Sequence, residues 1–378
     1  MASALPQQQA RQTHPVPVSR PGRARVAVVH LLVALPLIAL AVWAARRGYT
    51  DPGLRLLEHR AGLVKSGGRN LAGVRYGYPP LPIILALAVP AGPLGLSILT
   101  CLFSVATIYY LARRLRGRLP VATTLALIMP VAVVPAMWYM TTQLLAPVIA
   151  LTFLAIALDG FVQFAAFGKT EGGFAAGLAL TASYCADPGA LLYGAVMCAF
   201  APLISHARYH APGATAGVTA VLFFPMAAFA AGWSFLIWKF AGTFPGSLDY
   251  APGAHVLAFP GGLSGSLANA TRSALLALLH TPLYAAAGIV ILRRGPAAAA
   301  GLLLPVIALI AGLWLGFAYP GIDAYYMLTL LALTVISHTP SHRIQSLLIT
   351  AALAQTAIGV LWPPATPGFG NWTHALFS

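Results

Sequence analysis

The stretch Arg46–Leu85 reads RRGYTDPGLRLLEHRAGLVKSGGRNLAGVRYGYPPLPIIL and is the longest polar interruption in an apolar chain. It holds two of the seven acidic residues, Asp51 and Glu58, and seven of the 22 lysines and arginines. Through Tyr76–Leu81 (YGYPPL) it enters the apolar segment Pro80–Val89, which is too short to cross a bilayer as a helix. The stretch therefore predicts a large charged loop that leads into an interfacial or re-entrant helix.

The composition of the whole chain indicates a membrane protein. Apolar residues make up 59% of the 378 residues and charged residues 8%, and the mean hydropathy is +0.81. Soluble domains are about a quarter charged, and in lipid a helix satisfies its own backbone hydrogen bonds. We predict an all-α, polytopic membrane protein with about 11 transmembrane helices, because each span needs roughly 20 apolar residues. The predicted spans are 27–45, 93–112, 120–138, 144–165, 173–185, 188–204, 214–237, 272–292, 297–317, a helix that ends near 338–343, and 344–361.

The distribution of charge predicts one membrane domain with a cytoplasmic N-terminus. Residues 1–25 are polar, basic and rich in proline, so we interpret them as a disordered cytoplasmic tail. A single helical domain, 26–362, follows, with long outer loops at 46–79 and 239–270, and a short outer tail at 363–378 ends the chain. The net charge of +15 falls in short clusters between apolar runs, which favours contact with anionic lipid over nucleic acid as a partner. The alanine, glycine, proline and arginine bias is typical of a bacterial protein of the cell envelope, and we expect it in the cell (plasma) membrane.

The acidic residues gather on one side of the membrane in this topology. Five of the seven are predicted at the outer face, and Asp159 and Glu171 at the inner half. Carboxylates near lipid are costly and tend to mark functional sites or satisfied pairs, although loop polarity alone gives the same pattern. The five outer acids are Asp51, Glu58, Asp187, Asp249 and Asp323.

The seven basic residues of the first outer loop depart from the rule that positive charges stay inside. One explanation is that long loops cross the membrane regardless of their charge. The other is that these cations face an anionic ligand at the outer surface, such as a lipid phosphate. The residues that this second explanation concerns are Arg55, Arg60, Lys65, Arg69 and Arg75.

The order of these features resembles the GT-C type of glycosyltransferase, integral membrane enzymes that use polyprenyl-phosphate-linked sugars at the outer face. The likeness covers roughly residues 27–205 and is weaker around 318–333. The matching features are a first helix, an outer loop with acids, the Tyr78–Leu81 entry, a helix that ends in Leu111–Gly117, Pro130, the stretch Met140–Leu145 and the glycine-rich segment Gly172–Tyr193.

The resemblance implies a sugar donor like those of mannosyl- and arabinosyltransferases, with membrane lipid as a further partner. It also implies a catalytic acid early in the first outer loop, which is Asp51 here, with Glu58 as second choice. Such a carboxylate takes a proton from the acceptor hydroxyl, and nearby cations stabilise the departing phosphate. The residues implied in substrate binding are Arg55, Arg60, Lys65, Arg69, Arg75, Tyr78, Asp187 and Asp323.

Structural roles for the two acids stay open beside the catalytic ones. Thr50-Asp51-Pro52 is typical of a helix start, where an aspartate side chain caps the free N–H groups. Glu58 lies three residues after Arg55, and this spacing favours an ion pair on one helix face.

The sequence departs from the GT-C pattern at the end of the third predicted helix. Where many members carry a second acid, this chain has Thr141-Thr142-Gln143. Either Asp187 takes that role, or the metal site of some relatives is absent, or the chain is a non-catalytic envelope protein. No metal-binding motif occurs, and a divalent cation stays open as the one conceivable cofactor. A transporter or flippase is the rival function, with Asp159 as its one acid inside a predicted helix.

Overall fold

The structure is a computed structural model, and the ranges that it describes cover most of the predicted membrane domain. They are 23–66, 79–89, 92–167, 169–187, 189–198, 214–242, 262–292, 296–315, 322–336, 341–364 and 366–378.

Every element in these ranges is an α-helix, which confirms the predicted all-α class. Residues 190–198 are also helical. The elements are α1 (Arg23–Arg46), α2 (Pro52–Ser66), α3 (Pro80–Ala88), α4 (Gly92–Arg116), α5 (Val121–Ala132), α6 (Pro135–Gln143), α7 (Leu145–Phe167), α8 (Thr170–Ala186), α10 (Ala214–Ala241), α11 (Gly262–Leu279), α12 (Pro282–Leu292), α13 (Pro296–Leu315), α14 (Ile322–Val335), α15 (His342–Leu361) and α16 (Pro367–Phe377).

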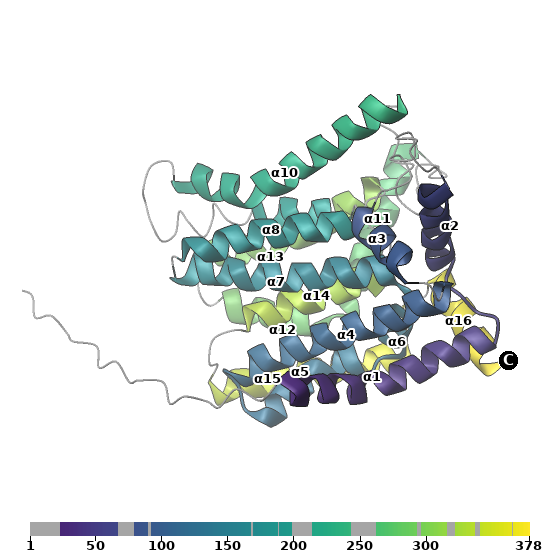
Figure 1. Ribbon diagram of the computed structural model, residues 1–378. Helices are drawn as coiled ribbons and strands as arrows, with labels where there is room; N and C mark the ends of the chain where they lie inside the picture. The colour runs from purple at the N-terminus through teal and green to yellow at the C-terminus, as the bar shows by residue number, and fades with distance from the viewer. Residues whose placement is uncertain are drawn as a thin grey trace, which may run out of the picture.

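The long helices form a bundle whose two ends differ (Figure 1). Helices α4, α7 and α8 run alongside one another, with α7 packed against both α4 and α8, and α15 packs against α5 and α12. The short helices α2, α3 and α16 lie together at one end, which we call the acidic end. The C-terminus of α4, with Arg113, Arg114 and Arg116 in its last turn, lies at the opposite end, which we call the basic end.

Several helices are long and apolar enough to cross a bilayer. Among the described residues, four helices meet this description alone, α4, α7, α10 and α15, and up to six spans result if each of two bent helix pairs counts as one. Large apolar side chains such as Phe224 (70% exposed) and Leu303 (62% exposed) point away from the bundle, as expected of a surface that faces lipid. The chain is therefore a membrane protein, and the predicted number of about 11 spans stays a prediction.

Two predicted spans are divided by sharp bends. The span predicted at 120–138 is the pair α5 and α6, bent by 68°, and α6 begins at Pro135. The span predicted at 272–292 is the pair α11 and α12, bent by 79°, and α12 begins at Pro282. Proline lacks the N–H of a helix interior and clashes with the preceding turn, so both breaks have a local cause.

A glutamine from another helix satisfies the backbone at the second bend. Gln355 of α15 accepts a hydrogen bond from the backbone N–H of Leu283 (3.3 Å) and donates one to the hydroxyl of Thr329 (2.7 Å). All three groups are buried. The side chain thus replaces an intrahelical partner that the bend removes.

The predicted outer loops are partly helical. As predicted, a short helix (α3) follows the charged loop, and α2 occupies much of that loop. The predicted second loop, 239–270, is shorter at both ends, because α10 continues to Ala241 and α11 begins at Gly262. The predicted C-terminal tail, 363–378, is mostly the helix α16.

An apolar cluster fixes α2 and α3 to the bundle. Helix α2 is amphipathic, with Leu54, Leu57 and Ala61 buried on one face. Its leucines pack with Ile83 of α3 and with side chains of α4, α7 and α8, the last of which contributes Ala186. The acids on or beside these helices are therefore held at one end of the molecule.

Candidate active site

The turn after α1 directs the chain back onto the bundle. Gly48 has a positive φ of 79°, a conformation that disfavours side chains. Its N–H donates to the carbonyl of Ala45, and the N–H of Tyr49 donates to the carbonyl of Ala44, both at 3.0 Å. This hydrogen-bond pattern is the Schellman motif, and it places Tyr49 and Asp51 directly after the first helix.

Asp51 caps the N-terminus of α2, so the helix-start interpretation is confirmed. Its Oδ1 accepts a hydrogen bond from the N–H of Gly53 at 2.7 Å, and Pro52 occupies the first helical position. A Cβ at Gly53 would lie 2.8 Å from Asp51 Oδ1, so the close cap requires glycine there.

The same carboxyl group is bound to a helix from the middle of the bundle. The hydroxyl of Tyr139, on α6, donates to Asp51 Oδ2 at 2.5 Å. The backbone N–H of Asp51 donates to Oε1 of Gln143 at 3.4 Å. Asp51 is only 6% exposed. This burial raises its pKa, although the hydrogen bonds from Tyr139 and Gly53 oppose the rise.

The C-terminal helix covers this cluster. Tyr49 donates a hydrogen bond to the carbonyl of Gly368 at 3.0 Å, and Tyr139 packs against the rings of Phe369 and Trp372. Trp372 is 2% exposed. Burial raises the pKa of Tyr49 to about 12, with a smaller contribution from the charge of Asp51. The Tyr49 hydroxyl therefore stays protonated at neutral pH.

The second-choice acid, Glu58, lies on the exposed side of α2 above the start of α4. A Cβ on Gly92, the first residue of α4, would lie 3.1 Å from Glu58 Oε1. A carboxylate at a helix N-terminus is favoured by the helix dipole. The alternative ion pair of Glu58 with Arg55 is not formed, although the structure describes both residues.

Asp187 lies beside the same apolar cluster, directly after the buried Ala186. Its Oδ1 accepts a hydrogen bond from the N–H of Gly189 at 2.6 Å. Burial raises the pKa of this carboxyl to about 6, although that hydrogen bond opposes the rise. The structure thus brings Asp51, Glu58 and Asp187 to the acidic end.

The other predicted binding residues are only partly described. Arg55 and Lys65 are exposed on α2, and Arg60 is half-buried on the same helix. Asp323 is the second residue of α14, and the structure describes its backbone but not its side chain. The predictions that lie outside the described residues altogether concern Arg69, Arg75, Tyr78 and Asp249.

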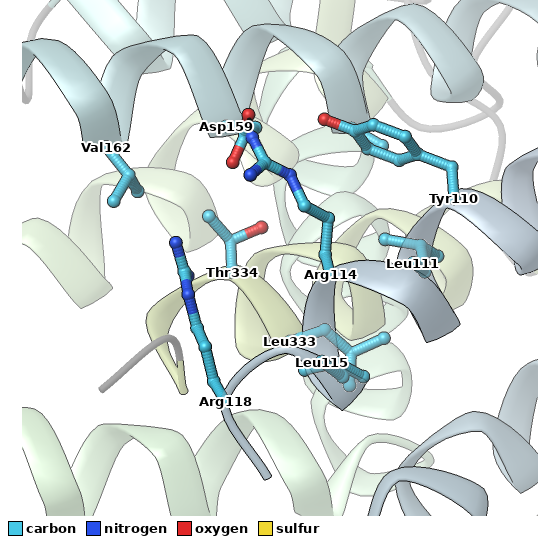
Figure 2. Close-up of a pocket in the computed structure, with 10 residues that line it drawn as sticks. Tyr110, Leu111, Arg114, Leu115, Arg118, Asp159, Val162, Leu333 and Thr334 are labelled. Carbon is cyan, nitrogen blue, oxygen red and sulfur yellow. Dashed lines mark ion pairs between the residues drawn. The ribbon is translucent and has the colours of Figure 1, made fainter. Parts of the chain in front are cut away.

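Asp159 lies far from this site and is already paired. It forms an ion pair with Arg114 of α4 and accepts a hydrogen bond from Gln163 Nε2 at 2.9 Å. Figure 2 shows the Arg114 guanidinium directed at this carboxylate. Arg114 therefore neutralises the acid on which a transporter function would depend, and Gln163 helps to orient it.

The described residues bring no three metal-ligating side chains together. No group of three or more His, Cys, Asp or Glu side chains in these ranges has the geometry to hold a metal ion.

Comparison of the chain with protein-family models, with curated proteins and with solved structures finds no match. Any assignment therefore depends on the chemistry of the site itself.

Three features of the site escaped the sequence analysis. Tyr139 was not predicted as a site residue, and Gln143 was considered only as the replacement of an acid. Helix α16 was predicted as a tail, although Thr366-Pro367 is a typical helix start. The Thr366 hydroxyl indeed accepts a hydrogen bond from the N–H of Phe369 at 3.4 Å. Cap chemistry could have predicted α16, but no local pattern joins Tyr139 to Asp51.

Proposed function

We propose that this chain is a membrane glycosyltransferase that moves a sugar from a polyprenyl phosphate to an acceptor hydroxyl at the outer membrane face. One observation carries the proposal: a buried aspartate, Asp51, lies just after the C-terminal end of α1 and accepts a hydrogen bond from Tyr139. In this proposal the acidic end faces the outside of the plasma membrane, and the N-terminus lies in the cytoplasm.

The proposed reaction is an attack of the acceptor oxygen on the anomeric carbon of the donor. The carboxylate of Asp51 takes the hydroxyl proton, the new glycosidic bond forms, and the bond to the polyprenyl phosphate breaks. The phosphate leaves with the bonding electrons, and a cation such as Arg55 of α2 stabilises its charge.

The hydrogen bonds of Asp51 leave acceptor positions on its carboxylate for this role. A carboxylate has about four acceptor positions, and Tyr139 and Gly53 occupy one each. The raised pKa of Asp51 makes it a stronger base than an exposed aspartate. This shift favours catalysis, because the ideal general base has a pKa near the working pH. Tyr139 acts as a positioning residue that fixes the orientation of the carboxylate.

The position of Gln143 supports a reaction without a metal ion at Asp51. GT-C enzymes resembled by this chain often carry an acid at the end of the third span, and Gln143 stands there. Its amide oxygen lies beside the backbone of Asp51 rather than at its carboxylate. Two carboxylates could bind a divalent cation together, but the neutral amide of Gln143 supplies no second negative charge beside Asp51.

The proposal is tested with the purified full chain in liposomes that contain hexosyl or pentosyl polyprenyl phosphates. The assay measures release of polyprenyl phosphate in the presence of membrane-envelope acceptors. The wild type is expected to turn over one of the donors, and Asp51→Asn to lose that activity. Glu171→Gln, which changes an exposed acid at the basic end, serves as the matched control and keeps it. Equal turnover by Asp51→Asn and the control would remove Asp51 as the base.

A transporter or flippase is the second candidate function, and the two bent helix pairs favour it. Transporters often build their sites at broken helices, and the bend of α11 and α12 lies beside the buried His280 and Gln355. His280 is already bound to the carbonyl groups of Leu276 and Trp362. Movement of fluorescent polyprenyl phosphate across the same liposomes, unaffected by Asp51→Asn, would favour this alternative.

A further inference from the structure

A polar hollow lies at the basic end of the bundle, remote from Asp51. It has a volume of about 480 Å³ and is lined by Tyr110, Arg113, Arg114, Gly117 and Arg118. This volume is within the range of small-molecule sites. The 25 residues of α4 separate this hollow from Glu58, which lies over the other end of the helix.

The three arginines of the hollow carry more charge than the described residues neutralise. Arg114 is paired with Asp159, which is the single ion pair among the described residues. Arg113 and Arg118 therefore have no acidic partner there. Arg118 is half-buried, and its pKa is lowered by burial and by the nearby charge of Arg114. A charge in this position is costly unless an anion compensates it.

The arrangement of the side chains separates Arg118 from the existing pair. Figure 2 shows Arg114 reaching Asp159, while Arg118 extends past Thr334 toward Val162. The space between Arg114, Arg118 and Asp159 is only about 40 Å³, so it accommodates little more than a water molecule. A larger anion would have to bind on the Arg113 side, where the wider hollow lies.

Two ordinary explanations account for part of this charge. Basic residues inside the membrane set topology, and cations at a helix C-terminus complement the helix dipole. Both effects explain an exposed charge such as Arg116 in the last turn of α4, and the first also explains Arg343 at the start of α15. Neither requires a half-buried guanidinium beside a hollow, as Arg118 is.

We propose that this hollow binds a phosphate oxyanion, presented by the headgroup of an anionic phospholipid or by a soluble phosphate. Guanidinium groups bind phosphate oxygens through paired N–H donors, and Arg113 and Arg118 of the lining provide such donors. Clusters of basic residues beside a membrane-spanning helix are suited to anionic headgroups. The site is independent of the transferase proposal, because it lies at the opposite end of α4.

The test measures binding of phosphatidylglycerol, phosphatidylcholine and inorganic phosphate to the purified full chain in a neutral detergent. Native mass spectrometry reports bound lipid, and thermal stabilisation reports phosphate. Phosphatidylglycerol is expected to bind more tightly than phosphatidylcholine. Arg118→Gln and Arg113→Gln are each expected to weaken the binding of phosphatidylglycerol about tenfold, because the loss of a hydrogen bond to a charged group lowers an affinity by at least this factor. Phosphate binding that is lost with the same variants would assign a soluble ligand instead.

Arg343→Gln is the matched control, because Arg343 is exposed at the start of α15 and does not line the hollow. This variant is expected to keep full affinity. Arg118→Lys keeps the charge but not the paired donors, so it is expected to fold and to bind several-fold more weakly. The proposal is overturned if neither phosphatidylglycerol nor phosphate binds, or if the Arg118 variants and Arg343→Gln bind equally.

Discussion

At Asp51, one carboxyl group has two structural partners, the N–H of Gly53 and the hydroxyl of Tyr139. Asparagine would keep only part of this arrangement, because its amide has one acceptor oxygen and an NH2 donor where the carboxylate has two acceptor oxygens. The burial that raises the pKa of Asp51 makes its charge costly. A buried titratable group with a raised pKa is expected at a site that transfers protons.

Removal of the Tyr139 hydroxyl tests the coupling of the two residues. Tyr139→Phe leaves a buried oxygen of Asp51 without this partner, so we expect a loss of about 1–3 kcal/mol in the free energy of unfolding. In the Asp51→Asn background the loss is expected to be smaller, because the amide is a weaker acceptor than a carboxylate. Denaturant unfolding of the four proteins of this cycle measures the coupling energy, and purely additive losses would show that the pair is not coupled.

Asp187 predicts a pH dependence of stability. Its pKa is raised from 3.8 to about 6, so between these values the folded chain holds a proton that the unfolded chain has released. The contribution of Asp187 is therefore fully present below pH 3.8 and is lost as the pH rises through about 6, with a slope of at most about 1.4 kcal/mol per pH unit.

The Asp187→Asn variant checks this sign. Its thermal midpoint, measured in detergent from pH 4 to 7, is expected to fall less with rising pH than that of the wild type. Parallel curves for the two proteins across this window would show that Asp187 has an ordinary pKa.

At the scale of elements, cap and turn residues allowed part of the fold to be predicted. Asp51-Pro52 begins α2, and Pro80, at the end of YGYPPL, begins α3. Gly48, with its positive φ, ends the turn after α1. These signals are local, because each depends on the backbone chemistry of two or three adjacent residues.

The bends were not predictable in the same way. Pro36, Pro225 and Pro305 lie inside unbroken helices, whereas Pro135 and Pro282 begin new ones. A proline therefore marks a potential break but does not decide it. At Pro282 the break is stabilised by Gln355, which lies 72 residues beyond Leu283. Such a partner is decided by tertiary packing, which one sequence does not reveal.

Helix α16 provides a direct test of how the elements at the acidic end fit together. A Cβ on Gly368 would lie 2.2 Å from the Tyr139 hydroxyl oxygen, so Gly368→Ala must displace either α16 or Tyr139. We expect a loss of about 1–3 kcal/mol in stability, as for other overpacked sites. Gly370→Ala is the control, because a Cβ there meets nothing within 4 Å. Equal unfolding midpoints for the two variants would mean that α16 does not pack on Tyr139.

At the scale of the whole molecule, three acids and the arginine cluster of α4 lie at opposite ends of the bundle, although Arg55, Arg60 and Lys65 of α2 share the end of the acids. The buried or surface acids Asp51, Glu58 and Asp187 lie at the end formed by α2 and α3, and the arginine cluster of α4 lies at the other. A helix of 25 residues is about 37 Å long, which is enough to cross the hydrocarbon core of a bilayer. The sequence allowed this separation to be predicted from the order of apolar runs, but not the residues that contact Asp51.

The predicted orientation is tested by cysteine labelling. Cys101, Cys185 and Cys198 are first replaced by alanine, and Glu58→Cys or Glu171→Cys is then introduced at exposed positions on opposite ends. With a membrane-impermeant maleimide on intact cells, Glu58→Cys is expected to react and Glu171→Cys to react only after the cells are opened. The reverse pattern would place the acidic end in the cytoplasm, where the proposed donor chemistry does not apply.

The most direct measurement is the turnover of Asp51→Asn relative to the wild type in liposomes, at equal thermal stability. The account predicts that release of polyprenyl phosphate falls at least about 100-fold, because general-base catalysis contributes roughly 10²–10⁴-fold, while the unfolding midpoint stays unchanged or rises. A variant that folds equally well and keeps the wild-type rate would contradict the account, and Asp51 would then be a helix cap and no more.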